Sequence, residues 1–329
     1  MTASTLKATL EAKKGFGDQF SIKNRTHITV FSYILLTLIY LALVWFLPPN
    51  RSSLDKYNIS ELEGKLLGLT FVLPLVGVWF SALYGYLRFR AYALLIRTSP
   101  EGPSFKYLAD GLMILAFGLP FSSIISSLFN YYSARNPQWL ATTTILRNYS
   151  DIVIYFSAFA ILYIGARNLY KSLRVKQQKD EYFLKYNIFI TITVSTVFAW
   201  LLIANPINAG AGSSDSIYYL PNWLVIFTIA IPYLFSWYFG SMASYWLLKY
   251  QKRVTGKMYK QPFNNLAKGI AVIVFDAMLI RFIASLSPRL ERLNLTPLLL
   301  IIYVLVLLYI LGYGLVARGA KGLKKIEEV

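Results

Sequence analysis

The chain of 329 residues contains no cysteine and only one histidine, His27. Without cysteine there can be no disulfide bond, thiol nucleophile or cysteine-held iron–sulfur cluster. A single histidine also excludes multi-histidine metal sites and catalysis by a Ser–His pair. The sequence has no Gly-rich phosphate loop either. We therefore predict no metal site, and the residues identify no cofactor.

Charged residues are scarce, at 15% of the chain, whereas hydrophobic residues make up 56%. Soluble domains contain about 25% charged and about 45–50% apolar residues. The apolar residues here lie in runs of about 20, the length at which a helix crosses about 30 Å of hydrocarbon. Because backbone polar groups in lipid must be satisfied internally, these runs predict helices. The expected fold class is all-α, a polytopic integral membrane bundle of about eight transmembrane helices.

This pattern divides the chain into a basic N-terminal segment (1–27), a transmembrane domain (28–317) and a short basic tail (318–329). The first apolar run is longer than the core of a signal peptide, and no small-residue cleavage site follows it. It is therefore predicted to be the first membrane helix. The eight predicted spans are 28–47, 66–88, 107–130, 150–170, 185–204, 222–247, 267–287 and 296–317.

Lysine and arginine are unevenly shared between the two sides that these spans define. Of the 33 Lys and Arg residues, 25 lie in the termini and in the loops on the same side, and seven lie in the opposite loops. Loops rich in Lys and Arg stay in the cytoplasm, so both termini are predicted to be cytoplasmic. The expected location is the cell membrane, plasma or inner, of a prokaryote.

The net charge of +18 comes largely from this basic side. The positive residues flank the apolar runs and do not form a separate module, so we expect no nucleic-acid partner. Membrane lipids are the expected partners, with anionic lipid at the cytoplasmic face, because each Lys or Arg near an anionic surface contributes about 1 kcal/mol. A second copy of the chain or another protein is a further candidate.

The stretch VIVFDAMLIRFIASL, residues 272–286, places Asp276 at the centre of the seventh span and Arg281 in its outer third. A carboxylate at the centre of a membrane helix costs about 2.5–3.5 kcal/mol, and such groups usually face a bundle interior or a wet cavity. Five residues turn the two side chains about 140° apart, so an ion pair within the helix is not expected. Arg281 can extend its long side chain to the interface. Asp276 is therefore either a proton- or cation-handling group or a neutral carboxyl that joins two helices.

Other polar side chains within the spans are weaker candidates. Asp110 follows Lys106 by four residues, a spacing that suits an interfacial pair. The stretches PFSSIISSL and TITVST place several hydroxyl groups on one helix face, which predicts either a polar path or hydrogen bonds between helices. These hydroxyl groups belong to Ser122, Ser123, Ser126, Ser127, Thr191, Thr193, Ser195 and Thr196.

Proline and glycine mark further positions within the spans. Pro74, Pro120 and Pro232 each remove a backbone donor and can kink a helix, as in the broken helices of transporters, although plain spans also tolerate proline. The even-numbered spans share a glycine near a tyrosine and ahead of basic residues. This pattern predicts either a repeated two-helix unit with close packing or only aromatic belts beside basic loops. The four glycines are Gly85, Gly165, Gly240 and Gly312.

Three functions remain open from these features. Transport or permeation of an ion or small solute fits the bundle, the central Asp276, the prolines and the hydroxyl groups. A membrane sensor or accessory subunit that acts through its basic cytoplasmic face fits the charge distribution. An intramembrane enzyme acting on lipid would need paired acid and base residues, and none can be named. Transport is the preferred interpretation, the sensor or accessory role is its alternative, and we predict no enzyme.

Overall fold

The computed structural model describes residues 16–48, 54–55, 58–136, 140–173, 231–254, 257–285 and 295–327. These described residues contain long α-helices and no strand. The helices are α2 (Phe16–Phe46), α4 (Glu61–Leu95), α5 (Gly102–Arg135), α6 (Leu140–Ser172), α9 (Ile231–Arg253), α10 (Lys257–Ser285) and α12 (Leu295–Glu327).

Six of the described helices are long and apolar enough to cross a membrane, so the chain is a polytopic helical membrane protein. Two of the eight predicted spans stay predictions. Span 185–204 lies outside the described residues. Span 222–247 is described only from Ile231 onward, as α9, and that helix is not among the six. The six membrane-crossing segments are Thr26–Phe46, Glu61–Leu95, Gly102–Tyr132, Ser150–Ser172, Lys260–Ile280 and Leu299–Leu323.

The helices run past the ends of the predicted spans. α12 continues through Glu327, so the segment from 318 that was expected to be a separate tail is largely helical. α2 already begins at Phe16, within the predicted N-terminal segment. Packing explains the extension of α12, because a Cβ on Gly319 would lie 2.7 Å from the backbone oxygen of Pro262 in α10. That contact holds the extra turns of α12 against a neighbouring helix.

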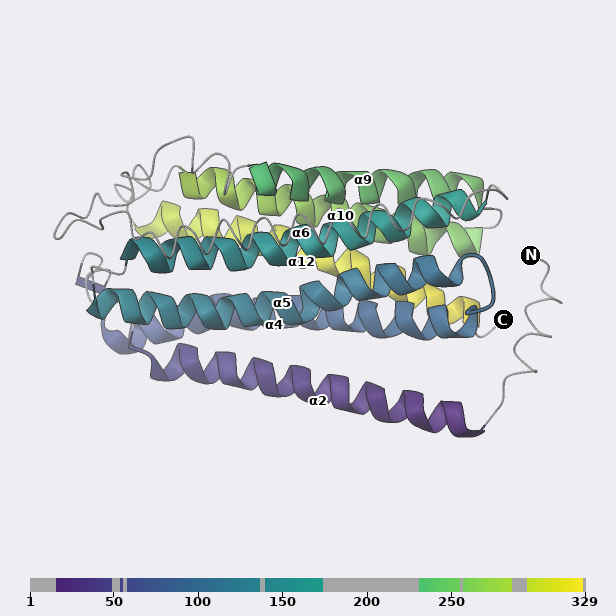
Figure 1. Cartoon of the computed structure of the whole chain (residues 1–329). Helices are drawn as coiled ribbons and strands as arrows, with labels where there is room; N and C mark the ends of the chain where they lie inside the picture. The colour runs from purple at the N-terminus through teal and green to yellow at the C-terminus, as the bar shows by residue number, and fades with distance from the viewer. Residues whose placement is uncertain are drawn as a thin grey trace.

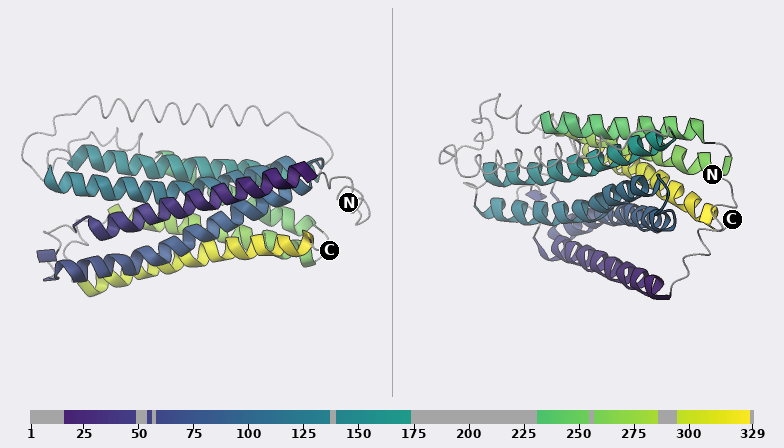
Figure 2. Two further views of the ribbon diagram at one scale, coloured as in Figure 1. Left: turned by 90° about the horizontal axis from the view of Figure 1, so that it is seen from below. Right: turned by 45° about the vertical axis from the view of Figure 1, so that its right-hand side comes forward.

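Six helices form a closed ring in which each packs against the next, in the order α4, α5, α6, α9, α10 and α12, with α12 returning to α4. α2 lies outside this ring, against α4 and α5 (Figures 1 and 2). Tyr33 and Tyr40 are the side chains that α2 buries most completely among its apolar residues. The Tyr33 hydroxyl donates to the backbone oxygen of Val76 on α4 at 3.3 Å. The other face of α2 exposes large apolar side chains, as a lipid-facing helix does.

The start of α4 is set by its own sequence. Ser60 is the N-cap, and its hydroxyl accepts a hydrogen bond from the Glu63 backbone N–H at 3.3 Å. The Glu63 carboxylate in turn accepts from the Ser60 backbone N–H at 2.8 Å, which completes a capping box. Glu61 and Glu63 also place negative charge at the positive end of the helix dipole. These interactions set where α4 begins.

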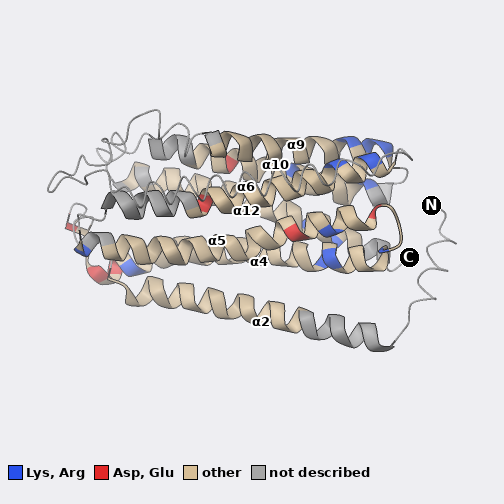
Figure 3. Ribbon diagram, in the orientation of Figure 1, with Lys and Arg blue, Asp and Glu red and all other residues tan. Residues whose placement is uncertain are grey.

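Lysine and arginine gather at one end of the bundle (Figure 3). We call this the basic end; α4, α6, α9 and α12 end there, and α5 and α10 begin there. The charges come from every helix of the ring. The Lys and Arg whose side chains the structure describes in that half of the bundle are Arg88, Arg90, Arg97, Lys106, Arg167, Lys171, Lys249, Lys252, Arg253, Lys260, Lys268, Arg318 and Lys321.

Candidate functional site

Asp276 lies on the face of α10 that turns into the bundle. Its side chain is 0% exposed, and neither carboxyl oxygen has a hydrogen-bond partner among the described residues. The neighbouring Ala277 is also buried, whereas Phe275 and Met278 are exposed on the outer face of the helix. A buried polar group without a partner costs about 1–3 kcal/mol. Asp276 is therefore a polar group that the packing of α10 alone does not explain.

Three tyrosines from two other helices lie near Asp276 in the interior of the bundle. The hydroxyl groups of Tyr155 on α6 and Tyr309 on α12 form a hydrogen bond. The ring of Tyr309 lies 5.1 Å from that of Tyr313, and Asp276 interacts electrostatically with both. All four side chains are buried. We call Tyr155, Asp276, Tyr309 and Tyr313 the tyrosine layer.

The tyrosine layer spans the interior of the ring. α10 and α12 run antiparallel, and a Cβ on Gly312 would lie 2.8 Å from Ile273 Cγ1. Asp276 follows Ile273 by three residues on α10, and Tyr309 precedes Gly312 by three residues on α12. In an antiparallel pair of helices, this register places Asp276 opposite Tyr309. α6 and α12 are not neighbours in the ring, so the Tyr155–Tyr309 bond crosses the interior. The layer thus joins α6, α10 and α12 through side chains.

A second polar cluster lies one helical turn from Tyr155, toward the end of the bundle opposite the basic end. Asp151 precedes Tyr155 by four residues on α6, so the two share a helix face. The Ser122 hydroxyl on α5 donates to the Asp151 carboxylate and lies 3.0 Å from the Ser150 hydroxyl. Asp151 is half-buried. Polar groups therefore continue from the tyrosine layer toward that opposite end.

The interior on the basic side of the layer is packed closely around glycines. A Cβ on Gly165 of α6 would lie 2.9 Å from the Ser104 backbone oxygen and 3.0 Å from the Leu108 backbone nitrogen on α5. A Cβ on Gly269 of α10 would lie 2.7 Å from the backbone oxygen of Gly312 on α12. These distances are too short for a side chain, so the helix backbones touch. We call this part of the interior the glycine-packed half.

The other glycines singled out by the sequence are also buried. A Cβ on Gly85 would lie 3.0 Å from Leu112 Cδ1 on α5, and one on Gly240 would collide with Val274 Cγ2 on α10. Both glycines thus lie where neighbouring helices pack. The two interpretations of the pattern, a repeated two-helix unit with close packing or aromatic belts beside basic loops, stay predictions.

The proline candidates fall at different places in their helices. Pro74 lies inside α4 and Pro120 inside α5. Pro232 is the second residue of the described part of α9. Pro262, which the sequence analysis did not single out, lies inside α10 and contacts the positions of Gly319 and Gly322 on α12. Pro262 therefore contributes to helix packing at the basic end.

The remaining polar candidates do not join the tyrosine layer. The Ser127 hydroxyl donates to the Ser123 backbone oxygen at 2.9 Å, and Ser123 forms a side-chain hydrogen bond with Tyr40 of α2. Ser126 is half-buried nearby. Asp110 is half-buried and lines a cleft at the basic end. The residues Thr191, Thr193, Ser195 and Thr196, and the side chain of Arg281, lie outside the described residues.

Sequence reasoning missed Tyr155, Tyr309, Tyr313 and Asp151. Tyrosines near the ends of spans look like an interfacial belt, which hides those that turn inward. One signal was present: Tyr309 and Tyr313 are four residues apart, on one helix face, within an apolar span. The rotation of the helices, which the sequence does not show, determines that this face points inward.

The tyrosine layer can exchange a proton or hold a small cation. A carboxyl group accepts or releases a proton, and tyrosine hydroxyls both donate and accept hydrogen bonds. Within the described part of the chain, no group of three His, Cys, Asp or Glu side chains could hold a metal ion together. In comparisons with protein-family models, curated proteins and solved structures, the chain matches none of them. Any functional assignment therefore has to come from the residues of the site.

Proposed function

We propose that the protein moves an ion or a small solute across the membrane, with Asp276 as its proton- or cation-handling residue. The observation that carries this proposal is the burial of the Asp276 carboxyl, with neither oxygen hydrogen-bonded to a described residue. Ionisable groups within membrane helices usually line an ion pathway or a proton relay. A purely structural carboxyl would be expected to bond a neighbouring helix, and no such bond occurs among the described residues.

The surrounding hydroxyl groups support the same chemistry. The Tyr155–Tyr309 pair offers oxygens that can coordinate a cation or relay a proton. From Tyr155 the polar groups continue to Asp151 and Ser122. We infer that Asp276 is reached from the end of the bundle at which Asp151 lies. A cation or proton would then meet Asp151 before the tyrosine layer.

The glycine-packed half supplies the other element of a transport cycle. It lies between Asp276 and the basic end, where adjacent helices touch at Gly165 and Gly269 and interior side chains such as Leu108 and Leu266 are fully buried. Release on that side would require the helices to separate there. An interior that is polar toward one end and closed toward the other is what alternating access around a fixed site requires.

The orientation in the membrane belongs to the same proposal. Because Lys and Arg concentrate at the basic end, we place that end in the cytoplasm and assign the protein to the cell membrane, plasma or inner, of a prokaryote. Eight spans would put both termini at this end. α2 begins and α12 ends there, which supports the arrangement (Figure 1).

Proton and cation flux into proteoliposomes tests the function. Wild-type protein is expected to carry flux that Asp276→Asn abolishes, because the amide cannot exchange a proton or offer a negative charge. Asp276→Glu, which keeps the carboxyl, is expected to retain part of the flux. Asp55→Asn is the matched control, because Asp55 is an exposed carboxylate outside the membrane-crossing segments.

Each variant must first elute as a monodisperse species and retain its helical circular dichroism. Absence of flux from correctly folded wild-type protein, for every ion tested, would overturn the transport proposal for ions. Equal flux from wild type and Asp276→Asn would remove Asp276 from the mechanism.

The alternative function is a membrane sensor or accessory subunit that acts through the basic end. The observation in its favour is the concentration of exposed cations on the loop-facing ends of the helices, including Lys252 and Arg253 in the last turn of α9. A soluble protein partner, or a second copy of the chain, could bind this surface. Copurification of a defined partner, lost when Lys252 and Arg253 are both replaced by Glu, would favour this function over transport.

A further inference from the structure

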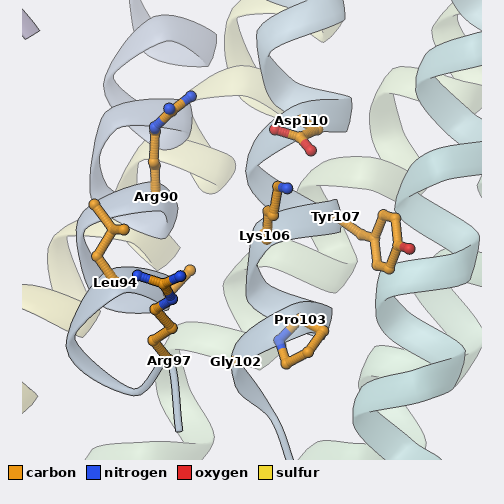
Figure 4. Close-up of a pocket in the computed structure, with 9 residues that line it drawn as sticks. Arg90, Leu94, Arg97, Gly102, Pro103, Lys106, Tyr107 and Asp110 are labelled. Atoms are coloured by element: carbon orange, nitrogen blue, oxygen red, sulfur yellow. The ribbon is translucent and has the colours of Figure 1, made fainter. Parts of the chain in front are cut away.

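A cleft of about 630 Å³ lies at the basic end, between the end of α4 and the start of α5. Arg90 and Arg97 line it from one side, and Lys106 and Asp110 line it from the other. Figure 4 shows these side chains around the space between the two helices. The cleft is separate from the tyrosine layer, because it opens at the ends of the membrane-crossing segments Glu61–Leu95 and Gly102–Tyr132.

The turn between the two helices builds the floor of this cleft. The Ser99 backbone N–H donates to the Ile96 oxygen at 2.9 Å, and the Gly102 N–H donates to the Ser99 oxygen at 3.1 Å. A Cβ on Gly102 would lie only 2.6 Å from the Ile96 backbone oxygen. Glycine at this position therefore lets α5 begin directly against the end of α4. The backbone of this turn therefore fixes the distance between the two helices that form the walls of the cleft.

The cations of the cleft are not neutralised by neighbouring carboxylates. Among the described residues, no carboxylate lies within ion-pair distance of Arg90, Arg97 or Lys106. Asp110 attracts Lys106 and Arg90 through space but does not form an ion pair with either. The Arg90 guanidinium donates one hydrogen bond, at 2.6 Å, to the Tyr86 hydroxyl, which orients it without cancelling its charge. Three cations and one carboxylate leave a surplus of two positive charges.

The start of α5 adds to this positive potential. Its N-cap residue, Glu101, makes no side-chain capping hydrogen bond, and its first turn contains no acidic residue. Gly102 and Pro103 from this first turn line the cleft. The Gly102 N–H is bonded to the Ser99 oxygen and Pro103 has no N–H, so this helix start contributes the positive end of its dipole. That end lies beside the arginines and the lysine, an arrangement that favours an anion.

We propose that this cleft binds the phosphate group of a membrane lipid and prefers a phosphomonoester headgroup to a phosphodiester. A phosphomonoester carries a charge of about −1.5 to −2 near neutral pH, which matches the surplus of two positive charges. It also presents three terminal oxygens, enough for the two guanidinium groups and the ammonium group together. A phosphodiester carries one negative charge and leaves part of this surplus unmatched.

The position of the cleft favours a lipid over free phosphate. It lies at the adjoining ends of two membrane-crossing segments, beside the turn that connects them, and lipid headgroups are expected next to such ends. Leu94, which lines the same cleft, is 37% exposed, and Pro103 is also exposed. Apolar side chains next to the cations offer a surface for the acyl chains. The site does not depend on the transport proposal, and its test needs no flux measurement.

Lipid binding to the purified full-length protein tests the proposal, by native mass spectrometry and by the shift of the thermal unfolding midpoint. The probes are phosphatidic acid, phosphatidylglycerol and phosphatidylcholine with identical acyl chains, and inorganic phosphate. We expect phosphatidic acid to bind about tenfold more tightly than phosphatidylglycerol, which corresponds to one additional charge-assisted contact. Phosphatidylcholine and inorganic phosphate are expected to produce no shift at the same concentrations.

Two variants and one control assign the binding to the cleft. The double variant Arg97→Gln with Lys106→Gln is expected to bind phosphatidic acid about a hundredfold more weakly, since two charged contacts are removed. Lys252→Gln removes an exposed cation at the basic end outside the cleft and is expected to bind like wild type. Asp110→Asn is expected to bind phosphatidylglycerol more tightly, because it removes the opposing charge.

Several results would overturn the proposal. Unchanged binding in the double variant, or an equal loss in Lys252→Gln, would mean that the cleft is not the site. A similar shift with inorganic phosphate would replace the lipid by a free anion, and equal affinities for phosphatidic acid and phosphatidylglycerol would remove the preference for a monoester. If the double variant does not fold, Asp110→Asn alone decides, and unchanged or weaker phosphatidylglycerol binding in it would contradict the proposal.

Discussion

The interior of the helix ring differs between the tyrosine layer and the glycine-packed half. In the layer, large polar side chains from α6, α10 and α12 meet, and Asp276 has no hydrogen-bond partner among the described residues. In the glycine-packed half, the side chains are absent where the backbones touch, as at Gly165 and Gly269. The same ring thus combines a region that contains a buried polar group without a described partner and a region in which helix backbones touch.

This difference has a physical consequence for stability. Where helix backbones touch without intervening side chains, the dispersion attraction between the helices is strong, and this attraction is a main force that joins helices in lipid. A buried carboxyl without a partner has the opposite effect, because it lowers stability wherever it lies. We therefore expect substitution of a packed glycine and removal of the Asp276 carboxyl to change stability in opposite directions, with the glycine effect the larger of the two.

Substitution of Gly165 is expected to have the largest effect. In Gly165→Val, the new side chain would collide with backbone atoms of Ser104 and Leu108, which cannot move aside like a flexible side chain. Overpacking of this kind lowers the free energy of unfolding by about 3 kcal/mol. The midpoint of SDS-induced unfolding in mixed micelles measures the change.

Gly77→Val is the matched control for Gly165→Val. Gly77 also lies within a helix, but a Cβ there has nothing within 4 Å. We expect its effect to stay within about 0.5 kcal/mol. If the two valine variants were equally destabilised, the loss would come from the helix backbone and not from contact between α5 and α6.

The hydrogen bond across the ring is expected to contribute somewhat less. Tyr155→Phe removes one hydroxyl and leaves the buried Tyr309 hydroxyl without that partner. The free energy of unfolding should fall by about 2 kcal/mol, the penalty for a buried polar group left unpaired. In the double variant with Tyr309→Phe, both hydroxyl groups are absent, so the loss should be smaller than the sum of the two single losses. Strictly additive losses would show that the two tyrosines do not interact in the membrane.

The sequence predicted the helices better than it predicted the site. Hydropathy alone identified the membrane-crossing segments, because a run of about 20 apolar residues matches the thickness of the hydrocarbon core and is uncommon in other structures. It also located Asp276 in the middle of a span. It could not place Tyr155 opposite Tyr309, since these residues lie on helices that are neither adjacent in sequence nor neighbours in the ring. Such pairs depend on helix rotation, and hydropathy does not report rotation in spans that are apolar on all faces.

The cleft at the basic end illustrates the same limit. Arg90, Arg97 and Lys106 were counted as part of a basic loop, a count that says nothing about their convergence in one cleft. Gly102 brings them together, because only a residue without a Cβ permits the contact with the Ile96 backbone oxygen. A glycine directly before a proline at the start of a helix was the one local signal of this turn.

Replacement of Asp276 by an apolar residue with the same branching is expected to act in the opposite direction to Gly165→Val and Tyr155→Phe. Asp276→Leu removes a buried carboxyl that has no partner among the described residues, so the free energy of unfolding should rise by about 1 kcal/mol. The same variant should lose transport activity. Functional sites often show such a trade-off, in which a substitution raises stability and lowers activity. SDS-induced unfolding measures the gain. A loss of stability would mean that Asp276 has a partner, and it would then join two helices.

The smallest expected effect is a dependence of stability on pH at Glu101, in the turn between α4 and α5. Burial raises the pKa of the Glu101 carboxyl above its ordinary value of 4.5, while a hydrogen bond with Tyr250 on α9 partly opposes the shift. Because the folded pKa exceeds the unfolded one, the folded state binds more protons between the two values. Stability is therefore fully present below pH 4.5 and declines as the pH rises through the folded pKa.

Glu101→Gln isolates this contribution from those of the other carboxyl groups. The variant cannot ionise, so it should match wild type in acid and become more stable than wild type as the pH rises. The difference should remain below about 1 kcal/mol, because the carboxyl is only partly buried and solvent screens its charge. Thermal unfolding midpoints of both proteins across the acid range measure it. A difference that does not change with pH would mean that the folded and unfolded pKa values of Glu101 coincide, with the Tyr250 hydrogen bond cancelling the effect of burial.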